Sequence, residues 1–216
     1  MASSVQPDVG TDAPLYWQEA CRHLMKRDRV MKKLIPQHVG VSLQSRGDAF
    51  VTLARSIVGQ QISVKAAQSV WDRFSVLPKK MLPAQVLKLK VDDMRAAGLS
   101  ARKVEYLVDL ALHFANDQVQ VKAWADMDDE AIIAELVGIR GIGRWTAEMF
   151  LIFHLMRPNV LPLDDIGLQN GISHAYFSGE PVSRSEIREV AVSWAPFCSV
   201  ATWYIWRSLD PLPVSY

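Results

Sequence analysis

The sequence predicts an all-α protein built from two helical lobes. Apolar residues recur with a helical period along the 216 residues, which is typical of helices with one buried face. There is no convincing alternation of apolar and polar residues and no hairpin dipeptide between β-rich runs, so strands are not predicted. The chain also lacks a fixed-period repeat. Half of the residues are hydrophobic and 22% are charged, a composition typical of globular proteins.

The first half of the chain contains four predicted helices. Asp48 is the expected start of the segment DAFVTLARSIVG, whose apolar residues share one face. The loop GQQIS interrupts this pattern, and Ser63 is the expected N-cap of the next helix. A short helix in VDDMRAAGLS is closed by Gly98, and Ser100 begins a longer helix after it.

The second half contains further capped helices. Asp128 is the expected N-cap of the helix in MDDEAIIAELVG. The segment SRSEIREVAVSW carries a capping box formed by Ser183 and Glu186. The aromatic segment SVATWYIWRSL forms the C-terminal helix, in which Trp203 is expected to lie in the core.

The charge changes sign along the chain. Residues 1–108 hold 17 Lys and Arg against 9 Asp and Glu, whereas residues 109–216 hold 7 against 14. A basic half would suit a polyanion, although a solvated helix face has the same composition. We expect a loose tail over residues 1–12 and a helical core over residues 13–216. The boundary between its two lobes is expected near residues 108–125, with a cleft between them.

Several classes of protein are excluded by composition. No apolar run reaches the roughly 18–20 residues that a membrane-spanning helix needs. The first ten residues lack the basic start and apolar segment of a secretory signal. Cys21 and Cys198 are too few for a disulfide framework or an iron–sulfur cluster. A reducing cytosol is therefore the expected compartment.

The segment ELVGIRGIGRWTAEMFLIFHLMRP predicts two helices joined by a glycine turn. Gly141 and Gly143 tolerate positive φ and allow another backbone to come close, while Ile142 packs inward. Amides at the start of the second helix form an anion site. A common αα-hairpin has the same pattern. A Walker-type loop is excluded because no Gly-Lys-Ser/Thr follows, and a dinucleotide fingerprint is excluded because a helix precedes the turn.

Two adjacent aspartates, Asp164 and Asp165, follow in LPLDDIGLQ. Adjacent side chains on a helix point about 100° apart, and His154 and His174 lack a ligand-like spacing, so a metal site is disfavoured. Capping is the stronger alternative, because an aspartate before an apolar helix is a normal N-cap. We assign capping or positioning to Asp164, and chemistry to Asp165.

These motifs resemble those of the helix–hairpin–helix superfamily of DNA glycosylases, named for its hairpin, its Gly/Pro-rich loop and its aspartate. IRGIGRWTA is similar to the hairpin, and the family's aspartate follows the hairpin after the second helix, where Asp165 stands 22 positions beyond Gly143. SIVGQQISVKAAQSVWDRF and AAGLSARKVEYLVDLA are similar to earlier segments. The likeness covers roughly residues 15–210 and is strongest to the alkylpurine branch, the 3-methyladenine DNA glycosylase II type.

The resemblance implies a role for each matching residue. Asp165 would stabilise the cation that develops on the sugar and orient the attacking water, and Gln61 would fill the space left by the extruded base. The implied DNA-contacting residues are Gln60, Gln61, Ser63, Lys65, Arg140, Gly141, Ile142, Gly143, Arg144 and Thr146. The implied base pocket consists of Trp145, Trp206, Met149 and Ile166.

The implied activity is monofunctional excision of alkylated purines in base excision repair. Strand-cleaving members have a lysine where this chain has Trp145, so no Schiff base is expected. An alkylated purine is already cationic and leaves readily, so one aspartate suffices. No cofactor is expected, apart from a monovalent cation at the carbonyls of residues 138–143.

The implied partner is double-stranded DNA with a damaged base, bound by a monomer without a membrane. The expected location is the cytoplasm with its nucleoid in a bacterium, or the nucleus in a eukaryote. Two alternatives stay open. One is a non-catalytic helix–hairpin–helix DNA-binding module, and the other is a lyase-type glycosylase, which Trp145 argues against.

Overall fold

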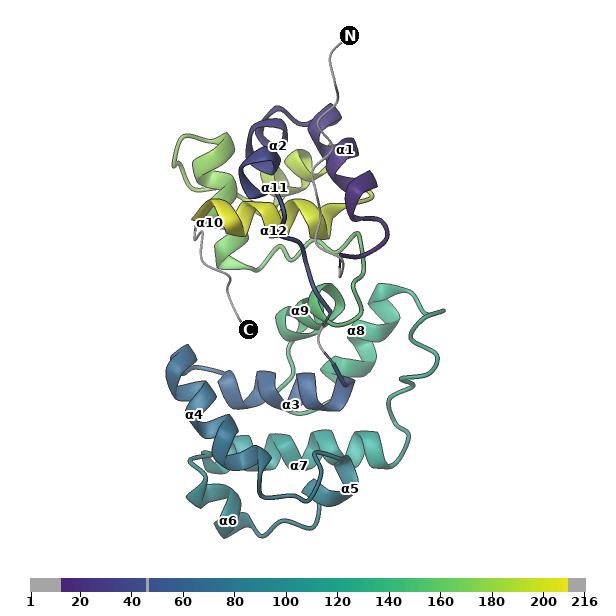
Figure 1. Ribbon diagram of the computed structural model, residues 1–216, viewed down its shortest axis with the longest axis vertical. Helices are drawn as coiled ribbons and strands as arrows, with labels where there is room; N and C mark the ends of the chain where they lie inside the picture. Colours follow the sequence, from purple (N-terminus) through teal and green to yellow (C-terminus); the bar gives the residue numbers. More distant parts are fainter. Residues whose placement is uncertain (1–12, 46, 210–216) are drawn as a thin grey trace. The chain divides into compact units, whose positions relative to one another are not determined.

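The computed structural model describes residues 13–45 and 47–209. Across these residues the chain is entirely helical and contains no strand, as predicted (Figure 1). The tail predicted at residues 1–12 lies outside the described residues. The α-helices are α1 (Trp17–Arg27), α2 (Arg29–Leu34), α3 (Ala49–Gly59), α4 (Val64–Ser75), α5 (Pro83–Val86), α6 (Val91–Ala96), α7 (Ala101–Ala115), α8 (Asp129–Val137), α9 (Arg144–Phe153), α10 (Ile166–Tyr176), α11 (Arg184–Ala191) and α12 (Cys198–Leu209); η1 (Ile35–His38) is a 3₁₀ helix.

Side-chain caps begin many of these helices. Each cap accepts a hydrogen bond from the amide of the third helical residue, which satisfies one N–H group that has no partner inside the helix. Five of the predicted N-caps are confirmed: Asp48, Ser63, Ser100, Asp128 and Ser183. The capping box of Ser183 and Glu186 is also present.

The described chain folds into two compact units. The first unit contains residues 13–45 and 151–209, and the second contains residues 47–150. Residues 108–125, near which the lobe boundary was expected, lie inside the second unit. The change of charge near residue 108 does not coincide with the boundary between the two units. The first unit is assembled from both ends of the chain, so it takes residues from the basic half and from the acidic half.

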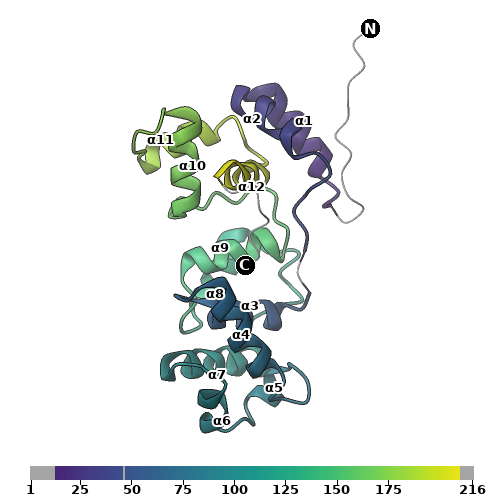
Figure 2. The ribbon, with the colours of Figure 1, turned by 60° about the vertical axis from the view of Figure 1, so that its left-hand side comes forward.

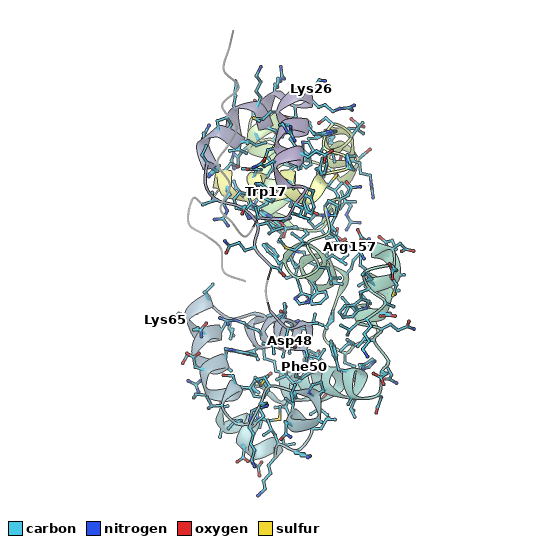
Figure 3. The ribbon with its side chains drawn as sticks, turned by 45° about the vertical axis from the view of Figure 1, so that its right-hand side comes forward. Trp17, Lys26, Asp48, Phe50, Lys65 and Arg157 are labelled. Carbon is cyan, nitrogen blue, oxygen red and sulfur yellow. The ribbon has the colours of Figure 1, made fainter. Side chains whose placement is uncertain are left out.

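The first unit packs around α12. In Figures 1 and 2, α12 lies between α10 on one side and α1 with α2 on the other. Trp17, labelled in Figure 3, contacts Trp203 edge-on with 5.2 Å between the ring centroids. Its ring also lies 5.7 Å from that of Tyr204. All three side chains are buried, which confirms the core position predicted for Trp203.

The second unit is organised by α7, which packs against α3 and α5. A chain of aromatic rings fills its core. Phe50 on α3 contacts Phe114 at 5.4 Å between centroids, and Phe114 contacts Trp124 at 6.4 Å. Trp124 then meets Phe150 of α9 at 5.4 Å. This core supports the turn between α8 and α9, where the predicted hairpin lies.

Candidate active site and DNA-binding hairpin

A tight turn joins α8 to α9. Helix α8 ends at Val137 with Gly138 as its C-cap, and the amide of Ile142 donates to the carbonyl of Ile139 across 3.1 Å. The Ile142 side chain is buried, as predicted for the residue between the two glycines. Because its side chain points into the protein, any contact between Ile142 and a ligand would have to involve its backbone.

The two glycines of the turn serve different ends. Gly141 has a φ of +86°, and a Cβ atom there would lie 2.2 Å from the ring of Tyr106 on α7. The fold therefore requires glycine at position 141. A Cβ atom on Gly143 would meet nothing within 4 Å. Packing within the protein does not require glycine at position 143, and the missing side chain leaves the start of α9 open to a ligand.

The backbone at this turn offers hydrogen-bond donors. No described residue accepts from the amides of Gly141, Gly143 or Arg144. The N-terminus of a helix carries partial positive charge, and amides that remain unused there bind anions such as phosphate. The arrangement fits the predicted phosphate site, and the contact with DNA itself stays a prediction.

Carboxylates hold both arginines of the turn. The amide of Arg140 donates to Asp109 across 2.8 Å, and its guanidinium lies 3.3 Å from Glu105. Arg144 donates to Glu130 at 2.8 Å. It also donates to the buried Glu148 at 2.9 Å. The hydrogen bond from Arg144 lowers the pKa of Glu130.

These ion pairs bear on the predicted DNA contacts of Arg140 and Arg144. Either guanidinium would have to exchange or share its carboxylate partner in order to bind a phosphate. Both side chains are more than half exposed, so such an exchange costs little desolvation. The two contacts stay predictions, as does a contact through Thr146, which is buried on α9.

The loop between α3 and α4 is tied to the hairpin. The Gln60 side-chain amide donates to the carbonyl of Gly141 across 2.8 Å, although the two residues are 81 positions apart. The next residue, Gln61, is exposed and has a φ of +58°, which side-chain-bearing residues rarely adopt. Gln60 thus holds the loop, while Gln61 is the exposed residue that the prediction assigns to the base-extrusion step.

The remaining residues of this loop lie at the start of α4. Ser63 caps α4 through the amide of Ala66, and Lys65, labelled in Figure 3, is exposed at the start of the helix. Lys103 on α7 donates to the carbonyl of Val58 at the end of α3 across 2.7 Å. Burial lowers the pKa of Lys103. The DNA contacts of Gln60, Gln61, Ser63 and Lys65 stay predictions.

Asp165 lies in the first unit, immediately before α10. It is buried and has the extended backbone of an N-cap, with φ of −77° and ψ of 117°. One carboxylate oxygen, Oδ1, accepts from the amide of Leu168 at 2.6 Å and from the indole Nε1 of Trp206 at 2.8 Å. The structure therefore joins the predicted catalytic aspartate to a predicted pocket residue 41 positions away.

The assignment of capping to Asp164 was wrong. Asp164 is half exposed and forms an ion pair with Arg184 of α11. Helix α10 begins at Ile166, so the residue that can reach its third amide is Asp165. The sequence pattern did not determine which of two adjacent aspartates precedes the first helical turn. Asp165 consequently caps α10, and its catalytic role stays a prediction.

Trp206 is buried and has a second contact that the sequence did not indicate. Its indole stacks on Phe153 of α9, with 5.7 Å between the ring centroids and 11° between the ring planes. Phe153 ends the apolar run after the hairpin, a position that gave no signal of proximity to the aspartate. The indole is held by Phe153 along one face and by Asp165 at its N–H group.

The other predicted pocket residues differ in exposure. Ile166, the first residue of α10 in the first unit, is 70% exposed. In the second unit, Trp145 is 38% exposed and Met149 is buried, both on α9. An exposed apolar residue next to a buried carboxylate suits contact with a ligand. The roles of these residues toward a base stay predictions.

Two further expectations concern ions and membranes. Within the described ranges, no group of three His, Cys, Asp or Glu side chains is placed to hold a metal ion. The carbonyl of Gly141, one of the carbonyls at which a monovalent cation was expected, accepts from the side chain of Gln60. That cation stays a prediction. None of the described helices is long and apolar enough to cross a membrane.

Comparisons with known proteins agree with this geometry. The model of a family described as HhH-GPD superfamily base excision DNA repair protein matches residues 54–196. DNA-3-methyladenine glycosylase 1 of Schizosaccharomyces pombe is 31% identical over 194 residues, covering 86% of this chain and 85% of the relative. A crystal structure of DNA-3-methyladenine glycosidase from Bacillus halodurans is similar with a TM-score of 0.83 and 31% identity, covering 93% of this chain and 91% of that one.

A second solved structure is that of the Schizosaccharomyces pombe 3-methyladenine DNA glycosylase Mag1 in complex with abasic DNA. It has a TM-score of 0.75 and 28% identity, and the match covers 91% of this chain and 100% of that one. The family match over residues 54–196 includes the loop after α3, the glycine hairpin and the buried aspartate. The chain therefore belongs to the HhH-GPD superfamily of base excision DNA repair proteins.

Proposed function

We propose that this protein is a monofunctional DNA glycosylase that excises alkylated purines from duplex DNA by hydrolysing the N-glycosidic bond. The observation that carries the proposal is the buried Asp165 carboxylate, held in place by the Leu168 amide and the Trp206 indole. A fixed carboxylate in a water-poor site stabilises a neighbouring cation far more strongly than it would in water.

The chemistry of the substrate explains why one carboxylate suffices. Breaking the bond between sugar and base builds positive charge on the sugar, and Asp165 would stabilise that charge and orient the attacking water. An N-alkylated purine already carries a positive charge and departs as a neutral base. Protonation of the leaving group by a separate acid is therefore not needed.

The second unit would supply the DNA-binding groups. Unused amides at the start of α9 suit a phosphate, and Gln61 would occupy the space left by the flipped base. Flipping a base costs a few kcal/mol, and less for a damaged base. In the first unit, the electron-rich ring of Trp206 would attract a cationic base, and aromatic stacking is worth about 1–3 kcal/mol per base.

The relatives support this substrate class. The similar proteins are named 3-methyladenine glycosylases, and one of them was solved with abasic DNA, the product of base excision. We therefore propose duplex DNA containing an alkylated base as the partner, and a monomer as the acting form. The proposed location is the cytoplasm of a bacterium, at its nucleoid, or the nucleus of a eukaryote.

The proposal is tested by incubating the protein with duplex DNA that contains a single 7-methylguanine. We expect free 7-methylguanine in solution and an intact strand that breaks only on later treatment with alkali. Capture of an enzyme–DNA adduct by borohydride would instead support a lyase, because it requires a Schiff base. DNA binding without release of any alkylated purine would support a non-catalytic binding module and would overturn the proposal.

A further inference from the structure

Helices α10 and α12 approach closely along two glycines of α10. Gly167 and Gly171 are four residues apart and therefore share one face of α10. A Cβ atom on Gly171 would lie 2.2 Å from the side chain of Ile205 on α12. The two helices are adjacent in Figures 1 and 2, and both belong to the first unit. This glycine face of α10 lets the backbone of α12 come near.

The first of these glycines lies directly beside the proposed catalytic carboxylate. A Cβ atom on Gly167 would lie 3.1 Å from Oδ1 of Asp165, 3.1 Å from Cδ1 of Trp206 and 3.2 Å from Nε1 of Trp206. These distances are shorter than ordinary van der Waals contacts. Any side chain at position 167 would therefore press on both partners of the hydrogen bond between Trp206 and Asp165.

Backbone conformation does not account for glycine at this position. The φ of Gly167 lies outside the left-handed region, so alanine could adopt the same backbone. Glycine also favours a helix less than alanine does, and α10 contains two glycines within its 11 residues. Glycine at position 167 therefore lowers the stability of α10, but the missing side chain makes room for the indole of Trp206.

We propose that Gly167 is a positioning residue for the catalytic aspartate. The absence of a side chain allows the indole of Trp206 to reach Oδ1 of Asp165 while the Leu168 amide holds the same oxygen. The inference rests on the proposed glycosylase function and assigns a role to a residue that makes no polar contact of its own in the site. Gly167 acts only through the position of Trp206 and Asp165.

The test compares single-turnover excision of 7-methylguanine by the wild type, Gly167→Ala, Trp206→Phe and the double variant. Asn170→Ala is the matched control, because Asn170 is exposed on the same helix. We expect Gly167→Ala to keep or raise the Tm, to bind DNA normally and to excise about tenfold more slowly, since a 1 Å misplacement can cost about 100-fold. Asn170→Ala should excise at the wild-type rate.

The double variant separates positioning from other effects. Phenylalanine at position 206 is smaller and has no N–H group, so Gly167→Ala should add little to the loss caused by Trp206→Phe. Multiplied losses in the double variant, or a wild-type rate for Gly167→Ala, would overturn the proposal. A lowered Tm accompanied by proportionate loss of DNA binding would also overturn it, because the effect would then be one of stability.

A spectroscopic measurement keeps this inference separate from the proposed function. The indole N–H resonance of Trp206 is identified as the resonance missing from Trp206→Phe. We expect it to shift in Gly167→Ala and to stay in place in Asn170→Ala. If the wild type releases no alkylated purine, the proposed function fails, and the resonance alone decides this inference. An unshifted resonance in Gly167→Ala overturns it in either case.

Discussion

The buried carboxylate of Asp165 is held in place by hydrogen bonds. Transfer of a carboxylate from water to a protein interior is unfavourable unless hydrogen bonds replace its hydration. Oδ1 of Asp165 accepts two such bonds, one from the first turn of α10 and one from Trp206. The dipole of α10 favours a negative charge at the same place. The capping role therefore supports the proposed catalytic role.

A pair of substitutions separates the two glycines of the hairpin. We expect Gly141→Ala to lower the free energy of unfolding by about 2 kcal/mol or more, because it combines an unfavourable φ with a clash against Tyr106. Gly143→Ala should leave the free energy of unfolding within about 0.5 kcal/mol of the wild type, because the new methyl group meets only open space in the protein. The same methyl group should weaken DNA binding, because it would occupy the space left open for a phosphate at the start of α9.

Urea unfolding and binding to undamaged duplex DNA measure these two effects. The comparison is informative because both changes add one methyl group to the same turn. Unchanged DNA binding by Gly143→Ala would count against phosphate recognition at the start of α9. Unchanged stability of Gly141→Ala would show that Tyr106 moves aside without cost.

At the scale of elements, α7 holds both parts of the proposed DNA-binding surface. Tyr106 packs against Gly141, and Asp109 accepts from the amide of Arg140. Lys103 donates to the last turn of α3. Gln60 then connects the loop after α3 directly to the hairpin. One helix thus sets the positions of two segments that are far apart in the sequence.

Loss of the Gln60 hydrogen bond should affect base extrusion. Gln60→Met keeps the length of the side chain but removes the donor to Gly141, a loss of about 1 kcal/mol. We expect excision to slow by roughly three- to tenfold, corresponding to about 1 kcal/mol. Gln18→Met, an exposed change on α1, is the control. The measurement is single-turnover excision together with the fluorescence of 2-aminopurine beside the lesion.

An unchanged rate and an unchanged fluorescence signal in Gln60→Met would contradict this account of the loop. A loss confined to overall DNA affinity would also contradict it, because the hydrogen bond is expected to place Gln61 and not to bind DNA itself.

A buried carboxylate joins the elements of the first unit. Asp28, which caps α2, accepts from the amides of Val30 and Met31 through Oδ1. Its Oδ2 accepts from Tyr176 at 2.9 Å and from Trp194 at 3.2 Å. Burial, together with the nearby Asp28 carboxylate, raises the pKa of Tyr176, so the hydroxyl remains a donor. Helix α2 is thereby tied to α10 and to the segment that follows α11.

Asp28→Asn should therefore destabilise the fold. The NH₂ group that replaces one carboxylate oxygen would face groups that now donate hydrogen bonds to Asp28, such as the Trp194 indole. We expect the free energy of unfolding to fall by about 2–4 kcal/mol. Asp126→Asn changes an exposed aspartate and should stay within about 0.5 kcal/mol of the wild type. Urea unfolding monitored by circular dichroism measures both variants. Equal stabilities for the two variants would contradict the structural role of Asp28.

Local features of the fold could be predicted, and contacts between distant segments could not. The caps at Ser63 and Ser183 depend on residues within one helical turn, so the sequence indicates them directly. The bond from Trp206 to Asp165 and the stacking on Phe153 depend on how α9, α10 and α12 pack. The wrong assignment of the cap to Asp164 is an intermediate case. A cap depends on local sequence, but a shift of one residue in the start of α10 decides whether Asp164 or Asp165 forms it.

At the scale of the whole molecule, the division into units could not be read from the charge pattern. The first unit joins residues near both ends of the chain, and hydrophobic periodicity carries no information on which helices meet. The candidate site residues follow from the family resemblance, whereas their contacts with distant segments depend on the fold. The predicted DNA-contacting residues all belong to the second unit, whereas Asp165 and Trp206 belong to the first.

Salt dependence tests whether the loop after α3 contacts DNA phosphates. Lys65 is exposed and forms no ion pair within the described residues. We expect Lys65→Ala to weaken binding equally for damaged and undamaged duplexes and to reduce the salt slope by about 1, as for one lost phosphate contact. Lys26→Ala on α1, labelled in Figure 3, removes the same charge and should leave the slope unchanged. Equal effects of the two variants would contradict a specific contact by Lys65.

We propose that Asp165, and not its neighbour Asp164, carries the chemistry. The most direct measurement is single-turnover release of 7-methylguanine by Asp165→Asn and Asp164→Asn, with duplex binding measured for each. Both changes remove one negative charge from adjacent positions, and asparagine preserves a possible cap at position 165. We predict that Asp165→Asn loses at least 100-fold in rate, on the scale of one lost electrostatic group in an active site, while Asp164→Asn stays near the wild type. Release of 7-methylguanine by Asp165→Asn at the wild-type rate would contradict a catalytic role for Asp165.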